Sequence, residues 1–180
     1  GADEAESWEN WGFRDTSFAI NDREVVEITG SRYELSGQEL PRLLPWIRET
    51  LAIDLDPRDQ HRNSYPTEIP AAVESPAFSK AIREFLKDEQ IDASGENRLR
   101  HGHGHTQEEM YAIKHKRLGR IPDMVLYPES EEQVSELIAT AKDHNVVLIP
   151  FGGGTNVTDA LRCSDNESRV IATVDMRRMN

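Results

Sequence analysis

The residues whose types and spacing suggest chemistry lie in one short stretch after an apolar run. Three successive glycines at 152–154 are followed by Thr155 and Asn156. Because glycines place almost no side chain over the backbone, a bulky anion can lie directly against their amide N–H groups. Such a row of amides can bind phosphate without a lysine, so the stretch predicts a site for the pyrophosphate of a nucleotide cofactor. The predicted cofactor-binding residues are Pro150, Phe151, Gly152, Gly153, Gly154, Thr155 and Asn156.

Other interpretations of these glycines fit less well. A phosphate-binding P-loop needs a lysine and a hydroxyl residue after its last glycine, but Thr155 and Asn156 follow here. A dinucleotide-binding fingerprint would need a small residue where Val157 stands, and 158–168 is a poor sequence for the long helix of that fold. A tight turn with a purely structural role remains an alternative.

Three histidines, His101, His103 and His105, alternate with glycines and raise the question of a metal site. In a strand, alternate residues share a face, so three imidazoles could converge on one ion. However, no acidic or cysteine ligand stands at a diagnostic spacing, and a structural turn before a helix over 106–116 is favoured. The sequence therefore predicts no metal site and leaves the role of these histidines open.

The elements expected to position the glycines have an α/β pattern. A strand over 124–127 is followed by a helix that Ser130 caps, and by a buried strand over 146–149. Pro150 is expected to end that strand, and 169–174 predicts another. The glycines would then leave the carboxyl end of a strand, where α/β sheets usually bind ligands.

The first half of the chain predicts a less regular region. Residues 1–24 predict an acidic, solvated arm whose aromatic side chains dock on a neighbouring surface. Ser36 and Glu39 form a capping-box pattern for a first helix, and a second helix is expected to begin at Ser75. An extended connector over 54–73 is expected between them.

Composition limits the classes of partner. The formal net charge of −12, from 33 acidic and 21 basic residues, argues against a nucleic-acid partner, whose phosphates need positive charge. Cys163 is the single cysteine and cannot form an intrachain disulfide. No apolar run approaches the ~20 residues of a membrane span, and no targeting signal is visible.

The arrangement of these motifs resembles a known flavoprotein family. The segment 121–128, the capped helix after it and residues 150–156 resemble the opening of the FAD-binding domain of the vanillyl-alcohol-oxidase superfamily. Four further segments resemble the alkyldihydroxyacetonephosphate synthase family within it: Trp8–Phe13, Ile28–Gly37, Arg100–His105 and Asp175–Asn180. The resemblance extends over most of the chain from about Trp8.

This resemblance implies a mixed fold of the α+β or α/β class. Residues 1–117 would form an N-terminal acidic arm and helical region. Residues 118–180 would form the first, incomplete part of a two-lobed FAD-binding domain, with 150–156 as its first FAD segment. The family's catalytic residues would lie beyond Asn180, so no catalytic residue is predicted in this chain, which looks like an N-terminal fragment, inactive by itself.

The resemblance also implies a reaction. The family exchanges the acyl chain of acyl-dihydroxyacetone phosphate for a long-chain fatty alcohol, which makes the ether-lipid precursor alkyl-dihydroxyacetone phosphate and releases a fatty acid. It implies a peroxisomal homodimer, with peripheral membrane association through regions outside this chain. Two alternatives stay open: an FAD-dependent 2-hydroxy-acid oxidase or dehydrogenase of the same superfamily, and a non-catalytic interaction protein.

Overall fold

The computed structural model describes residues 7, 12–53, 56, 69–115 and 118–179. Contacts divide the chain into two compact units, Gly1–Asn63 and Ser64–Asn180, and each is described by itself. The domain boundary expected between residues 117 and 118 stays a prediction. Trp8, Trp11 and most of the connector expected over 54–73 lie outside the described residues.

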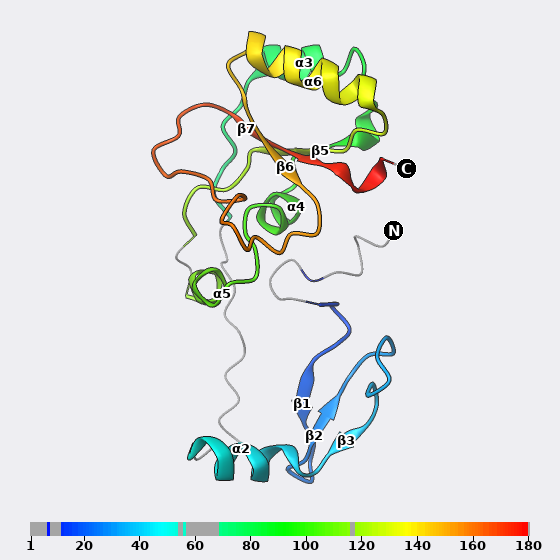
Figure 1. Cartoon of the computed structure of the whole chain (residues 1–180), viewed down its shortest axis with the longest axis vertical. Helices are drawn as coiled ribbons and strands as arrows, with labels where there is room; N and C mark the ends of the chain where they lie inside the picture. Colours follow the sequence, from blue (N-terminus) through cyan, green and yellow to red (C-terminus); the bar gives the residue numbers. More distant parts are fainter. Residues whose placement is uncertain (1–6, 8–11, 54–55, 57–68, 116–117, 180) are drawn as a thin grey trace. The chain divides into compact units, whose positions relative to one another are not determined.

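The described part of the first unit contains a small antiparallel sheet and the helix α2, Leu43–Leu51 (Figure 1). Its strands are β1 (Phe18–Ile20), β2 (Val26–Ile28) and β3 (Glu39–Leu40), in the order β1-β2-β3, followed by α2. Val26 and Ile28 point to the same face because alternate strand residues do so, and both are buried. These two side chains anchor the sheet.

Two predictions for this unit were wrong. Phe18–Ile20 forms a strand paired with β2, where the sequence predicted a solvated arm. Glu39 lies in β3 and accepts hydrogen bonds from Asn21 and Arg23, so it does not cap a helix. The helix begins later, at Leu43, and Pro45 falls in its first turn, where a missing N–H costs no helical hydrogen bond.

The second unit is built on a four-stranded sheet in the order β4-β5-β7-β6. The strands are β4 (Ile91–Asp92), β5 (Met124–Leu126), β6 (Val147–Phe151) and β7 (Ile171–Asp175). β7 pairs in parallel with both β5 and β6, whereas β4 is antiparallel to β5. Contrary to prediction, Pro150 does not end its strand, since the pairing continues to Phe151 opposite Asp175. β6 is an edge strand, and a proline is tolerated there when its nitrogen faces away from the ladder.

Four helices and two short 3-10 turns complete this unit as far as the structure describes it. They are α3 (Pro76–Ile82), η1 (Asp88–Gln90), α4 (Gly95–Arg100), α5 (Gln107–Lys114), α6 (Glu131–Asp143) and η2 (Met176–Arg178). The side chains of Ser75, Thr106 and Ser130 accept hydrogen bonds from the third residue of α3, α5 and α6, which confirms the predicted caps. In the described part of the chain, no helix is long and apolar enough to cross a bilayer.

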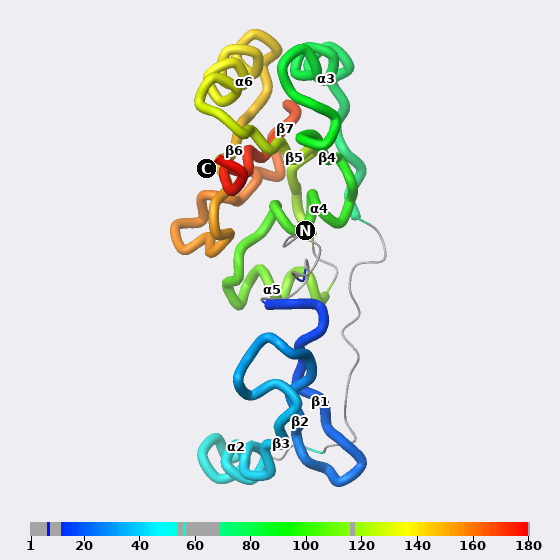
Figure 2. The backbone as a smooth tube through the Cα atoms, turned by 90° about the vertical axis from the view of Figure 1, so that its right-hand side faces the viewer, coloured from blue at the N-terminus to red at the C-terminus, as the bar shows by residue number. Residues whose placement is uncertain are grey.

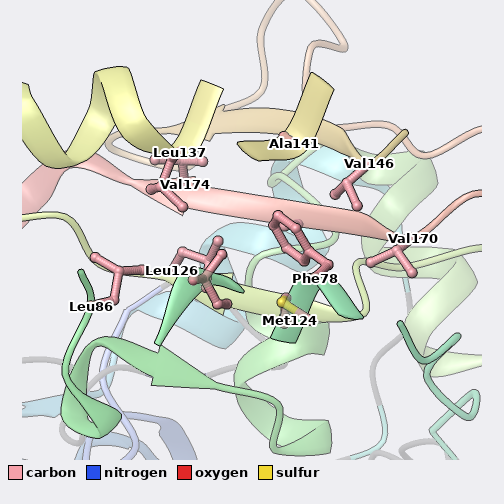
Figure 3. Packing of buried hydrophobic residues seen from close by; sticks show 11 residues of the cluster. Phe78, Leu86, Met124, Leu126, Leu137, Ala141, Val146, Val170 and Val174 are labelled. Carbon is pink, nitrogen blue, oxygen red and sulfur yellow. The ribbon is translucent and has the colours of Figure 1, made fainter. Parts of the chain in front are cut away.

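The main core lies between the sheet and the pair of helices α3 and α6, which pack side by side on one face (Figures 1 and 2). Leu137 of α6 lies beside Val174 of β7, and Ala141 of α6 belongs to the same cluster (Figure 3). The other members are Phe78, Ile82, Leu86, Met124, Leu126, Val146, Val170 and Ala172. α4 lies on the opposite face of the sheet (Figure 1). The sheet is therefore covered on both faces, and its carboxyl edge carries the glycines.

Candidate cofactor-binding site

The glycine loop, residues 152–156, leaves β6 at the carboxyl end of the parallel strands. Gly152, Gly153 and Thr155 are exposed. Among the described residues, no group accepts a hydrogen bond from the amides of residues 152–155. A Cβ built on Gly152 or on Gly153 would meet no atom within 4 Å. The amides of the loop therefore have no acceptor within the described part of the protein, and the space beside Gly152 and Gly153 is open, as a site for an oxyanion requires.

Phe151 supports the loop from below. Its side chain is buried, and its ring lies 4.3 Å, centroid to centroid, from the ring of His101. Gly154 has φ of +68°, and a Cβ there would lie 2.8 Å from Cζ of Phe151. The loop can thus turn over the aromatic ring only with glycine at position 154.

A buried charge cluster lies beside Phe151, at the end of β7. The carboxylate of Asp175 accepts a hydrogen bond from Nε2 of His101 (2.9 Å) and from the guanidinium of Arg177 (2.6 Å). Nδ1 of His101 donates to the carbonyl of Asn97 (2.8 Å), so both ring nitrogens face oxygen acceptors. Burial acts to raise the pKa of Asp175, but the hydrogen bonds from His101 and Arg177 outweigh it and hold the pKa well below its usual range. These bonds tie α4 to the carboxyl edge of the sheet.

Asn156 closes the loop with its side chain turned into the protein. It is buried, with φ of +52°. Its Oδ1 accepts from the amide of Leu161 (2.8 Å), and its Nδ2 donates to Oε1 of Glu109 (2.7 Å). The structure thus exposes Pro150, Gly152, Gly153 and Thr155 of the predicted site and buries Phe151 and Asn156, which hold the loop at its two ends.

The three histidines are divided among different environments. His101 ends α4 and is buried against the sheet, as described above. Nδ1 of His103 donates to the carbonyl of Gly104 (2.6 Å), and the ring of His105 lies edge-on to that of His103 at 6.1 Å. Among the described residues, no three His, Cys, Asp or Glu side chains are grouped so as to hold a metal ion.

A cavity of about 390 Å³ adjoins the site, and Asn156 belongs to its wall. Its other walls come from α4, α5, the turn between these helices and the segments 118–121 and 157–165, including His103, Arg120 and Cys163. Burial raises the pKa of the Cys163 thiol to about 11. The thiol is therefore protonated at neutral pH, and this residue is a packed side chain rather than a nucleophile.

Sequence reasoning missed two partnerships that shape the site, His101 with Asp175 and Glu109 with Asn156. The partners are 74 and 47 residues apart, so no local spacing connects them. The capping box of Thr106 and Glu109 was visible, but it accounts for one oxygen of the carboxylate and gives no sign of what the other oxygen binds.

Comparisons with known proteins show similarity to flavoproteins. Residues 122–180 match the model of the FAD binding domain, which confirms FAD as the predicted cofactor. The chain is 38% identical over 174 residues to an alkyldihydroxyacetonephosphate synthase from Caenorhabditis elegans, and the match covers 94% of this chain and 28% of that protein. A relative of the same name from Dictyostelium discoideum is 29% identical over 184 residues, covering 96% of this chain and 29% of that protein.

A solved structure shares the fold. It is titled as an alkyldihydroxyacetonephosphate synthase in space group P1, and it superimposes with a TM-score of 0.82 at 26% identity. The match covers 98% of this chain and 33% of that chain. The mixed α/β fold expected from the sequence is therefore confirmed, and this chain spans less than a third of the length of both curated relatives.

Proposed function

Because this chain is homologous to the alkyldihydroxyacetonephosphate synthases over nearly its whole length, we propose that it is part of an FAD-dependent enzyme of ether-lipid synthesis. The enzyme exchanges the acyl chain of acyl-dihydroxyacetone phosphate for a long-chain fatty alcohol. The products are alkyl-dihydroxyacetone phosphate and a fatty acid.

Within this enzyme, residues 150–156 hold the pyrophosphate of FAD. The observation that carries this assignment is the run of amides at 152–155, which have no acceptor among the described residues, beside the open space at Gly152 and Gly153. A diphosphate supplies the oxygens that such amides need, and backbone dipoles can bind it although the formal net charge of the chain is −12.

The roles of the individual residues follow from their exposure. Gly152, Gly153 and Thr155 present their amides to the diphosphate, whereas Phe151 and Asn156 keep the loop in shape. When bound, FAD supplies the reactive isoalloxazine ring, and the protein orients it. The residues described here bind and orient the cofactor, and none of them is assigned a catalytic role.

We also propose that the enzyme is a peroxisomal homodimer that associates peripherally with a membrane. The support is the homology to an ether-lipid synthase, since both its alcohol substrate and its fatty-acid product carry long apolar chains. Cell fractionation and light scattering of the complete protein test these statements. A monomer, or a protein confined to the cytosol, would contradict them.

The central experiment uses the complete protein as its gene encodes it. We expect a flavin absorption spectrum and the transfer of radiolabelled fatty alcohol onto acyl-dihydroxyacetone phosphate. Flavin reduction by a 2-hydroxy acid without alkyl transfer would contradict the proposed reaction. A purified protein without flavin that FAD cannot restore would contradict the proposal as a whole and support a non-catalytic role.

A single substitution tests the amide row separately. Gly153→Ala adds a methyl group on the exposed side of the loop, where no protein atom lies within 4 Å. We expect the variant to be as stable as the wild type but to bind FAD about tenfold more weakly, because the methyl group keeps the phosphates away from the amides. Unchanged FAD affinity would place the diphosphate elsewhere.

A further inference from the structure

Glu109 connects the start of α5 with the end of the glycine loop. Its Oε2 accepts from the amide (3.1 Å) and the hydroxyl (2.7 Å) of Thr106, as in an ordinary capping box. Its Oε1 reaches beyond the helix and accepts from the amide of Gly104 (2.7 Å) and from Nδ2 of Asn156 (2.7 Å). One carboxylate thus accepts hydrogen bonds from Gly104, Thr106 and Asn156.

This connection is held tightly on the Asn156 side. The Asn156 amide group is fixed at both of its polar atoms, by Glu109 and by the backbone of Leu161. A Cβ on Gly104 would lie 2.1 Å from Cβ of Asn156, so the backbone of the 102–105 turn lies directly against that residue. Asn156 cannot move outward without breaking both hydrogen bonds and opening this contact.

The electrostatics agree with a fixed, ionised carboxylate. Burial acts to raise the pKa of Glu109, but hydrogen bonds from Gly104, Thr106 and Asn156 outweigh it and lower the pKa below its usual value. The side chain is therefore charged at neutral pH. Hydrogen bonds to a charged acceptor are stronger than those between neutral groups, so the bond from Asn156 to Glu109 is stronger than a bond between two neutral side chains.

We propose that Glu109 is a positioning residue of the FAD site, which fixes the end of the glycine loop by holding the side chain of Asn156. This inference rests on the proposed function of the loop. The carboxylate does not touch the cofactor. It holds the end of the loop in place, so FAD meets a loop that is already ordered and spends less of its binding energy on ordering it.

The test exchanges hydrogen-bond donor and acceptor between positions 156 and 109 in the complete protein. FAD affinity is measured by flavin fluorescence titration of the FAD-free form. Asn156→Asp keeps an acceptor for Leu161 but sets a second carboxylate against Glu109. We expect FAD binding to weaken by about tenfold or more. Adding Glu109→Gln removes the repulsion and sets a donor against the new carboxylate at position 156, although that donor also faces the Gly104 amide, from which Oε1 accepts in the wild type. The double variant should therefore recover part of that loss, about threefold.

A matched control separates this role from helix capping. Thr106→Ala removes the cap of α5 together with the hydroxyl hydrogen bond to Oε2 of Glu109, and it leaves the bonds that Oε1 accepts from Gly104 and Asn156. We expect it to lower stability by about 1 kcal/mol and to leave the Kd for FAD within about twofold of the wild type. If Thr106→Ala weakens FAD binding as much as Asn156→Asp does, Glu109 acts through the helix and the inference is wrong.

Two further readouts keep the result unambiguous. In the FAD-free protein, hydrogen exchange at residues 152–161 should be faster in Asn156→Asp than in the wild type, and slower again in the double variant. If Asn156→Asp does not fold, Asn156→Ser, whose hydroxyl is too short to span to Glu109, takes its place with the same expected loss. A wild type that binds FAD while these variants bind it equally well overturns this inference alone, whereas a wild type that binds no FAD overturns the proposed function.

Discussion

Replacing Gly154 by alanine should destabilise the protein even without its cofactor. Gly154 has φ of +68°, and a new Cβ would lie 2.8 Å from Cζ and 3.3 Å from Cε2 of Phe151. The left-handed backbone costs a non-glycine residue about 1–2 kcal/mol. The Phe151 ring must also shift, although it lies between His101 and Arg177, and an off-rotamer side chain costs about 0.5–1.5 kcal/mol. Together these contributions predict a loss of about 2–3 kcal/mol.

Urea unfolding of the FAD-free protein, followed by far-ultraviolet circular dichroism, measures this loss as a shift in midpoint at constant slope. Gly153→Ala is the matched control, because its Cβ meets no atom within 4 Å and its φ is not in the left-handed region. We expect the control to lie within about 0.5 kcal/mol of the wild type. If Gly154→Ala is equally stable, or if both variants lose the same amount, the packing of the loop over Phe151 is not as described.

Three other substitutions or reactions test the surroundings of the site. Asp175→Asn should cost about 3 kcal/mol at pH 7, because it removes the buried charge that His101 and Arg177 face. Folding lowers the pKa of Asp175, so this carboxylate stabilises the folded protein above the unfolded pKa of about 3.9, and the stabilisation is lost as the pH falls below that value. The urea midpoints of wild type and variant should therefore converge in acid. A difference between the midpoints that does not narrow would contradict the ion pair. Leu137→Ala, at a fully buried position between α6 and the sheet, should cost about 3 kcal/mol in the same assay, and a loss below about 1 kcal/mol would mean that the helix does not pack there. Cys163 should react with iodoacetamide roughly a hundredfold more slowly in the native than in the unfolded protein at pH 8, because burial raises the pKa of its thiol to about 11, and equal rates would show that it is exposed.

Local chemistry was enough to predict three of the four described helices of the second unit, whereas α4 (Gly95–Arg100) was not predicted. Ser75, Thr106 and Ser130 each stand three residues before the amide that they cap, and this spacing is visible in the sequence. Asn145 follows α6 with φ of +55°, a left-handed conformation that asparagine commonly adopts after a helix. Such features depend on neighbours within one turn, so tertiary contacts were not needed to find them.

Features set by distant residues were not predictable in the same way. Glu39 has a good capping pattern with Ser36, but pairing with β2 draws it into a strand. Pro150 remains in a strand because β6 lies at the edge of the sheet. No local sequence pattern shows the order of the strands. In the candidate site, the loop was expected from its three successive glycines. The inward direction of the Asn156 side chain depends on Glu109, which is 47 residues away.

The position of β7 in the sheet has a consequence for synthesis on the ribosome. β5 and β6 are made first, yet neither pairs with the other, because β7 stands between them. Until residues 171–175 have left the exit tunnel, β6 has no described strand of this sheet to pair with, and β5 can pair only with β4. Residues 171–175 therefore join the two halves of the sheet, and the same strand brings Asp175 to His101 beside the glycine loop.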